Sequence, residues 1–74
     1  MTDISAQSLI PIWEETLQVS PVGQDDDFFE LGGDSLAATE LSLLIEEKFG
    51  CPCPIEDIFE NPTISELANA LRTP

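Results

Sequence analysis

The sequence predicts a small all-α protein: a bundle of three main helices and one short helix, with a long loop after the first helix. Three observations support this prediction. Apolar residues recur at helical spacing between proline and glycine residues, no segment alternates apolar and polar residues as a half-buried strand does, and the chain has 74 residues. We expect a single domain over residues 1–74, with a modest hydrophobic core.

The first helix is expected to run from Ser8 to Val19. Pro11 would then stand in its first turn, where the N–H that proline lacks is not needed. The alternative is a helix that begins earlier, at Ser5, and is kinked at Pro11. Its apolar face, set by the spacing i, i+3 and i+7, carries Ile10, Trp13 and Leu17.

A long loop is expected from Ser20 to Gly33. Pro21 and Gly23 interrupt any helix there, and loops of this length are often functional. The aspartates at 25–27 lack the central glycine and terminal glutamate of an EF-hand, so we interpret them as a solvated acidic turn rather than a calcium site. Four apolar residues can hold the loop against the core: Val22, Phe28, Phe29 and Leu31.

The second helix is expected from Ser35 to Phe49, and Gly50 stops it. Either Asp34 or Ser35 would be its N-cap. One apolar face belongs in the core and carries Ala37, Leu41, Leu44 and Ile45, with Ala38 and Phe49 at its edge. The opposite face carries Leu36 and Leu43, flanked by Glu40 and Glu47 on one side and by Thr39 and Glu46 on the other.

Two interpretations of the outer leucines, Leu36 and Leu43, remain open. Single exposed leucines are normal on soluble proteins and need no explanation. The functional interpretation is a docking strip, in which apolar anchors inside an acidic rim contact a partner beside the start of the helix.

The C-terminal half is expected to contain the short helix and the last helix. Prolines make Cys51-Pro52-Cys53-Pro54 an extended linker before one or two helical turns over Ile55 to Glu60. Three residues of these turns point inward or toward partners: Ile55, Ile58 and Phe59. Thr63 and Glu66 form a capping box for the last helix, which Pro74 would end. Its core stripe is Ile64, Leu67, Ala68 and Leu71.

Cys51 and Cys53 are the only cysteines. A Cys-x-Cys pair is too close for an easy disulfide, and no histidine or further cysteine could complete a zinc site. We therefore expect two reduced thiols, one of them tucked into the loop, and no metal.

Charge is the strongest compositional signal. Fifteen acidic residues face two basic ones, Lys48 and Arg72, for a formal net charge of −13. This excludes nucleic acid as a partner and favours partners with basic patches, although solubility alone is the simpler interpretation. No apolar run approaches the ~20 residues that cross a membrane, and residues 1–5 lack the features of a signal peptide. We expect a cytoplasmic monomer.

The candidate functional residue is Ser35, at the entrance of the second helix. Gly32 and Gly33 have no Cβ, so the chain can turn sharply and a partner enzyme can approach closely. A phosphate ester on Ser35 would lie at the unpaired N–H groups of a helix start, which favours it by ~0.3–1 kcal/mol. On spacing alone, the alternative is that Ser35 is a capping serine.

The stretch Asp27-Phe28-Phe29-Glu30-Leu31-Gly32-Gly33-Asp34-Ser35-Leu36 resembles the core motif of peptidyl carrier domains from nonribosomal peptide synthetases. The order of the expected helices agrees with that family over nearly the whole chain. The resemblance implies that a phosphopantetheinyl transferase moves 4′-phosphopantetheine from coenzyme A to Ser35, with Asp34 and Leu36 framing the serine. The thiol of that arm would hold an aminoacyl, peptidyl or acyl group as a thioester, and the chain itself would catalyse no reaction.

The resemblance also implies where partners bind. Carriers of this kind dock through their second helix, which points to Leu43, Glu40, Glu47 and Thr39. The expected partners are the transferase, an adenylation domain or an acyl or aminoacyl ligase, and condensation, tailoring or release enzymes. The chain fits a free-standing carrier and a domain of a larger synthetase equally well.

Three alternative functions follow from the same residues. The first is an acyl carrier of polyketide or fatty-acid type, although such carriers more often have a single glycine before Asp-Ser-Leu. The second is an esterase, because residues 33–36 spell Gly-Asp-Ser-Leu; a serine nucleophile usually needs a histidine, and the chain has none. The third is an acidic binding module in which Ser35 is only a cap.

The excess of negative charge predicts how stability depends on salt. Repulsion among the fifteen carboxylates opposes folding, and added salt screens it. We expect the melting temperature, followed by circular dichroism, to rise between low and moderate NaCl. A melting temperature that falls over this range would contradict the prediction.

Overall fold

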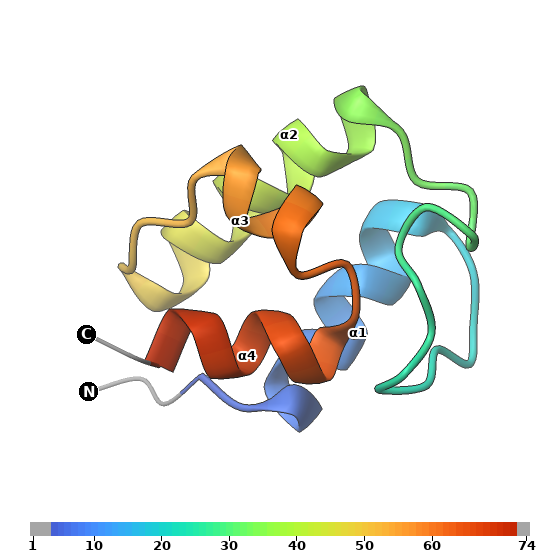
Figure 1. Ribbon diagram of the computed structural model, residues 1–74, viewed down its shortest axis with the longest axis horizontal. Helices are drawn as coiled ribbons and strands as arrows, with labels where there is room; N and C mark the ends of the chain where they lie inside the picture. Colours follow the sequence, from blue (N-terminus) through green and yellow to red (C-terminus); the bar gives the residue numbers. More distant parts are fainter. Residues whose placement is uncertain (1–3, 73–74) are drawn as a thin grey trace.

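The computed structural model describes residues 4–72 and contains four helices: α1 (Ala6–Leu17), α2 (Ser35–Phe49), α3 (Ile55–Glu60) and α4 (Ile64–Arg72). The predicted all-α bundle with one short helix is confirmed, and no strand forms within the described residues. Helix α1 packs against α2 and α4, while α3 lies against both α2 and α4 (Figure 1). The long loop between α1 and α2 lies at one end of the bundle, opposite the last turn of α4 (Figure 1).

Helix α1 begins earlier than its predicted start at Ser8. Ser5 is the N-cap: its hydroxyl accepts the Ser8 N–H at 3.2 Å, and the Ser8 hydroxyl accepts the Ser5 N–H at 2.9 Å. This reciprocal pair satisfies N–H groups that lack helical partners. Pro11 therefore lies inside α1 rather than in its first turn, and the alternative start near Ser5 is the correct one. The helix ends at Leu17, two residues before the predicted end.

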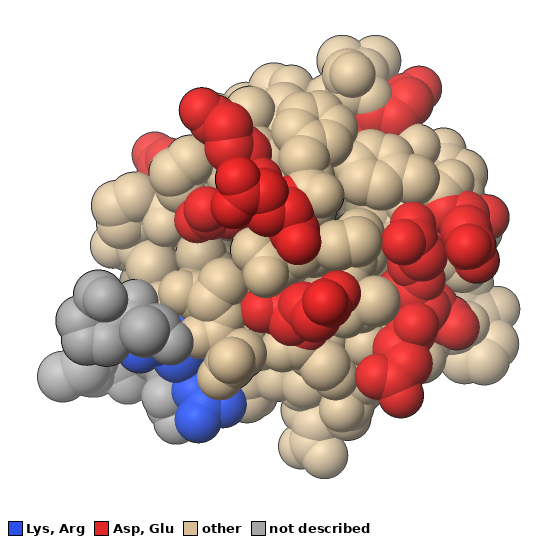
Figure 2. Space-filling view, in the orientation of Figure 1, with Lys and Arg blue, Asp and Glu red and all other residues tan. Residues whose placement is uncertain are grey.

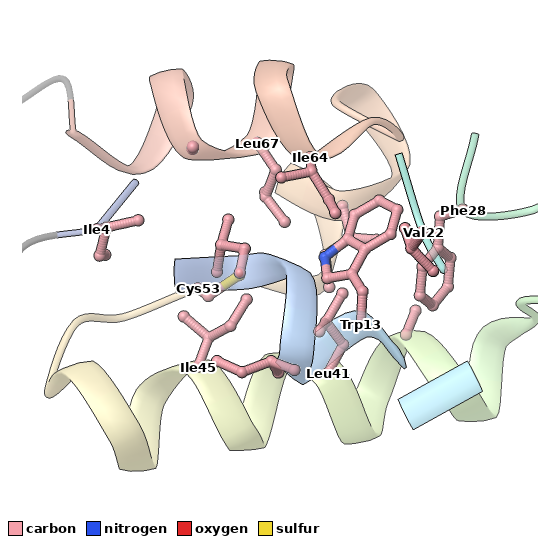
Figure 3. Packing of buried hydrophobic residues seen from close by; sticks show 14 residues of the cluster. Ile4, Trp13, Val22, Phe28, Leu41, Ile45, Cys53, Ile64 and Leu67 are labelled. Atoms are coloured by element: carbon pink, nitrogen blue, oxygen red, sulfur yellow. The ribbon is translucent and has the colours of Figure 1, made fainter. Parts of the chain in front are cut away.

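The core face of α1 is also shifted from the predicted stripe. The buried residues are Leu9, Ile12 and Trp13, whereas Ile10 and Leu17 are only partly buried. The reason is that α1 packs against two helices, so its apolar face is wider than one i, i+3, i+7 row. Trp13 lies at the centre of the core, between residues of α2 and α4 (Figure 3).

Helix α2 agrees with its predicted bounds and core face. Its fully buried residues are Ala38, Leu41 and Ile45, and Leu41 and Ile45 point from α2 toward the centre of the core (Figure 3). Gly50 ends the helix in the left-handed region, at φ 63°, where glycine is favoured. The other predicted core residues, Ala37, Leu44 and Phe49, are partly buried.

The loop is attached to the core and to the start of α4. Val22 and Phe28 are buried, as predicted. The Phe28 N–H donates to the Pro62 carbonyl at 2.7 Å, and the Ser65 N–H donates to the Gln24 carbonyl at 3.1 Å. Ser65 lies in the first turn of α4, whose N–H groups have no helical acceptor, so the loop helps to cap this helix.

The predicted pairing of Thr63 with Glu66 is present in a modified form. The Glu66 N–H donates to the Thr63 hydroxyl at 3.2 Å, and that hydroxyl donates to the Glu66 carboxylate at 2.9 Å. Glu66 thus binds the threonine side chain, whereas a full capping box would use the threonine N–H. Helix α4 buries Ile64, Leu67 and Ala68; its predicted end at Pro74 lies outside the described residues.

The acidic turn in the loop uses two of its aspartates for backbone hydrogen bonds. Asp26 accepts the Gly23 N–H at 2.8 Å, and Asp27 accepts the Phe29 N–H at 2.8 Å and the Glu30 N–H at 3.2 Å. These carboxylates therefore shape the turns that precede α2. Within residues 4–72 there is no group of three or more acidic, cysteine or histidine side chains that could hold a metal ion.

Both cysteines are free thiols, and one of them is in the core, as predicted. Cys51 is half-buried and Cys53 is buried. Burial, together with the negative charges of Asp57, Cys51 and Glu46, raises the pKa of the Cys53 thiol to about 12. Cys53 therefore remains protonated at neutral pH. The Ser42 hydroxyl donates to the Cys53 carbonyl and ties the linker to α2.

Charge is distributed unevenly over the surface. Acidic side chains form several groups across the face in Figure 2, whereas basic side chains appear at one end only, beside the residues drawn in grey. Lys48 and Arg72 belong to the last turns of α2 and α4. None of the described helices is long and apolar enough to span a membrane.

Candidate functional site

Ser35 is the first residue of α2, and Asp34 is the N-cap. The Asp34 carboxylate accepts the Ala37 N–H at 2.9 Å, and the Asp34 carbonyl accepts the Ala38 N–H at 2.9 Å. Of the two predicted caps, Asp34 is therefore the one that is used. Because Asp34 is the N-cap and Ser35 is already the first helical residue, the Ser35 side chain has no capping role.

The Ser35 hydroxyl is available for reaction with another molecule. Ser35 is exposed, and its Oγ makes no hydrogen bond to another residue in the described part of the chain. The chain contains no histidine, and the neighbouring Asp34 carboxylate is engaged by Ala37. The site thus lacks the histidine base that a serine hydrolase normally uses, and it suits a serine that a separate enzyme modifies.

The turn before Ser35 requires its two glycines for different reasons. Gly32 has φ 105°, which side chains rarely permit. Gly33 is packed against Phe28: a Cβ on Gly33 would lie 2.4 Å from the Phe28 ring carbon Cε2 and 2.7 Å from the Phe28 carbonyl oxygen. The Gly33 N–H also donates to that carbonyl at 3.0 Å. The first glycine thus provides a backbone conformation, and the second provides space.

A row of aromatic rings joins this turn to the core and to the surface. Phe28 contacts Trp13 edge to face, with ring centroids 5.1 Å apart (Figure 3). Phe29 contacts Phe28 in the same way at 5.2 Å and stacks on Phe59 of α3 at 5.4 Å. Aromatic pairs of these geometries are favourable beyond the area they bury. The loop before Ser35 is therefore held between α1 and α3.

The residues predicted on the outer face of α2 do lie on the surface. Leu36 is 69% exposed and Leu43 is 61% exposed. Glu40, which lies between the two leucines along the helix, and Glu47, which lies one turn after Leu43, are exposed as well. These four follow the spacing i, i+4, i+7, i+11, so the helix brings them into one stripe. Thr39 is exposed too, but its hydroxyl donates to the Ser35 carbonyl at 2.9 Å within the helix.

Phe59 is an exposed apolar residue, and the sequence did not decide whether its side chain points into the core or toward partners. Its side chain is 46% exposed, and with Leu36 and Leu43 it completes the large exposed hydrophobic residues of the described chain. Phe59 directly follows Ile58, which is fully buried, and neighbouring residues of a helix point in different directions. In a helix of only six residues, this pattern is too short to assign a face with certainty.

Comparison with known proteins decides the family. The region from residue 7 to residue 71 matches the family model described as "Phosphopantetheine attachment site". The chain belongs to this family. It is a phosphopantetheine-binding carrier domain, and its relatives are carrier domains of nonribosomal peptide synthetases.

Tyrocidine synthase 2 from Brevibacillus parabrevis is one such relative of the carrier domain. The two are 47% identical over 62 residues, which are 84% of this chain and 2% of that protein. The carrier domain spans 6% or less of the length of curated relatives such as this one. The similarity therefore concerns one domain of much larger synthetases.

Solved structures of peptidyl carriers have the same fold. A chain in the structure of the phosphopantetheine transferase Sfp with coenzyme A and a peptidyl carrier protein matches with TM-score 0.89 and 32% identity, over 100% of this chain and 96% of that one. The structure of McyG A-PCP with phenylalanyl-adenylate matches with TM-score 0.84 and 32% identity, over 96% of this chain and 11% of that one.

The capping role of Asp34 predicts how two substitutions differ. Asp34→Ala removes the acceptor for the Ala37 N–H and should lower the free energy of unfolding by about 1 kcal/mol. Asp34→Asn keeps a side-chain oxygen and should lower it by only a few tenths of that amount, since Asn caps nearly as well as Asp. Urea denaturation measures both values.

Asp25→Ala is the matched control for that experiment, because Asp25 is an exposed aspartate of the loop that caps no helix. If Asp34→Ala were as stable as Asp25→Ala, the cap would contribute nothing to stability.

Proposed function

We propose that Ser35 is the phosphopantetheine attachment site and that the domain carries an aminoacyl or peptidyl group between enzymes of a nonribosomal peptide or hybrid pathway. The observation that supports this most strongly is the exposed Ser35 hydroxyl, free of hydrogen bonds to the described chain, on the rigid start of α2. An acyl carrier of polyketide or fatty-acid type is the alternative. The Gly32-Gly33 pair and the synthetase relatives favour the peptidyl type.

The residues around Ser35 fit a phosphate ester. The Ala37 N–H donates to Asp34. The N–H of Leu36 lies in the same first turn, where the helix provides no acceptor, so it is available to a phosphate ester. The partial positive charge of the helix start favours a negatively charged group by ~0.3–1 kcal/mol. When bound, the arm supplies a terminal thiol that holds the acyl group as a thioester on a flexible tether. Ser35 and the turn before it set the point from which that tether extends.

The transferase must provide the base for the modification. Ser35 Oγ forms the new bond to phosphorus as coenzyme A loses its 3′,5′-ADP portion, and the serine proton has to leave. No histidine is present, and the carboxylate beside Ser35 accepts the Ala37 N–H of the helix start. The contribution of this chain is therefore an accessible nucleophile in a defined position, and the proton leaves to a group of the transferase.

The outer stripe of α2 is proposed as the docking surface for the transferase, for an adenylation domain or acyl or aminoacyl ligase, and for condensation, tailoring or release enzymes. Leu36 and Leu43 would enter apolar pockets, and Glu40 and Glu47 would meet basic residues at the rim of each pocket. Phe59 of α3 is a further exposed apolar side chain of the described residues. The transferase and adenylation complexes of the structural relatives support partners of these classes.

A cytoplasmic setting and a monomeric state are further parts of the proposal. They agree with a domain that takes its arm from coenzyme A and presents one stripe to several enzymes in turn. An acidic binding module is the remaining competitor, and it predicts no modification of Ser35.

Modification of Ser35 is tested by intact mass. The unmodified protein is incubated with coenzyme A, magnesium and a broad-specificity phosphopantetheinyl transferase, in parallel with Ser35→Ala. We expect a gain of one phosphopantetheinyl group in the natural sequence and none in Ser35→Ala, because only a hydroxyl at residue 35 lies at the expected position. Absence of the gain in folded protein, or its presence in Ser35→Ala, would contradict the proposal.

The docking stripe is tested with Leu43→Asp. This change replaces an apolar anchor with a charge but leaves the core intact, because Leu43 is 61% exposed. Loss of the burial of one leucine should lower kcat/KM for loading about tenfold, with near-normal stability. Gln7→Asp, at an exposed position of α1, is the control for the added charge. Full loading by Leu43→Asp, or gross unfolding, would argue against the stripe.

A further inference from the structure

Phe28 lies where the hydrophobic core meets the turn before Ser35. Its side chain is completely buried, and the ring reaches so close to Gly33 that no side chain fits there. Gly33 is two residues before Ser35 and one before the N-cap Asp34. The position of the Phe28 ring therefore determines how far the turn stands from the core.

The ring is itself held in place by its neighbours. Trp13 and Phe29 both contact the Phe28 ring edge to face. The angle between the ring planes is 78° for Trp13 and 86° for Phe29. Trp13 is completely buried at the centre of the bundle. Because protein interiors are close-packed, a ring held between these contacts has little freedom to shift.

The backbone of Phe28 is held on both sides as well. Its N–H donates to the Pro62 carbonyl at 2.7 Å, which links it to the segment between α3 and α4. Its carbonyl accepts the Gly33 N–H at 3.0 Å, which closes the turn. One residue thus joins the core, the start of α4 and the turn that leads to Ser35.

We propose that Phe28 is a positioning residue for the phosphopantetheinylation of Ser35. The inference rests on the proposed function. It adds that the distance of the Gly32-Gly33 turn from the core determines how fast the transferase modifies Ser35. When a transferase docks on α2, the position of Ser35 depends on the contact between the Phe28 ring and Gly33 in the preceding turn. A misplacement of about 1 Å can lower the rate of a positioned reaction by up to about 100-fold.

The test compares Phe28→Leu with Ile45→Val as the control. Leucine keeps an apolar side chain but lacks the outer ring atoms that support Gly33. Ile45 is a fully buried residue of α2, ten positions beyond Ser35, and its shortening perturbs the core without touching the turn. Both variants are assayed with coenzyme A and the transferase at a temperature at which circular dichroism shows them folded.

Separate measurement of kcat and KM distinguishes positioning from general stability. Phe28→Leu leaves Leu36 and Leu43 in place, so KM should stay within about twofold while kcat falls about five- to tenfold. Ile45→Val should change neither value by more than about twofold. A structural role alone would give two folded variants with the same kcat, and that result would overturn the inference.

The outcomes also separate this inference from the proposed function. If the natural sequence gains no phosphopantetheinyl group, the attachment proposal fails and this inference fails with it. If the natural sequence is modified and Phe28→Leu matches the control, only the inference fails. Should Phe28→Leu not fold, Phe28→Met, whose flexible side chain fills more of the same volume, is assayed under the same criteria.

Discussion

The fold around the site depends on one close contact, that between the Phe28 ring and the backbone of Gly33. A ring can lie this near to the chain only because residue 33 has no side chain. Through this contact the core supports a turn that carries no regular structure of its own. Ser35 can therefore lie outside the core, on the surface, while the turn before it is held by buried hydrophobic residues.

Charge and apolar packing have separate roles in this domain. The core consists of apolar residues alone among those described, and backbone N–H groups of the loop are bound by backbone carbonyls and by carboxylates. The carboxylates of Asp26, Asp27 and Asp34 hold backbone N–H groups of the loop turns and of the start of α2, whereas the exposed glutamates of α2 flank its exposed leucines. Surface charges other than these aspartates can therefore change to suit partners without rearranging the interior.

The sequence was most informative where single residues mark the ends of helices. Helix α2 agrees with its predicted bounds because Asp34 and Gly50 have strong local preferences. The start of α1 was predicted too late because Pro11 resembles a start signal and Ser8, at the third helical position, is not the usual partner of a capping serine. The Ser35 motif was evident, but its support by Phe28 was not, since a ring above a glycine leaves no pattern in the sequence. Nor could sequence predict that a Gln24 carbonyl would bind Ser65, because every residue has a carbonyl.

The hydrogen bond between Gln24 and Ser65 has a consequence for how the domain opens. A helix terminus normally frays on its own, but here separation of the first turn of α4 from the loop would break a contact on both sides. The irregular segment that leads to Ser35 is thus joined directly to the last helix, although 40 residues of chain separate Gln24 from Ser65. Local opening of the loop before Ser35 therefore has to break contacts with the C-terminal helix as well.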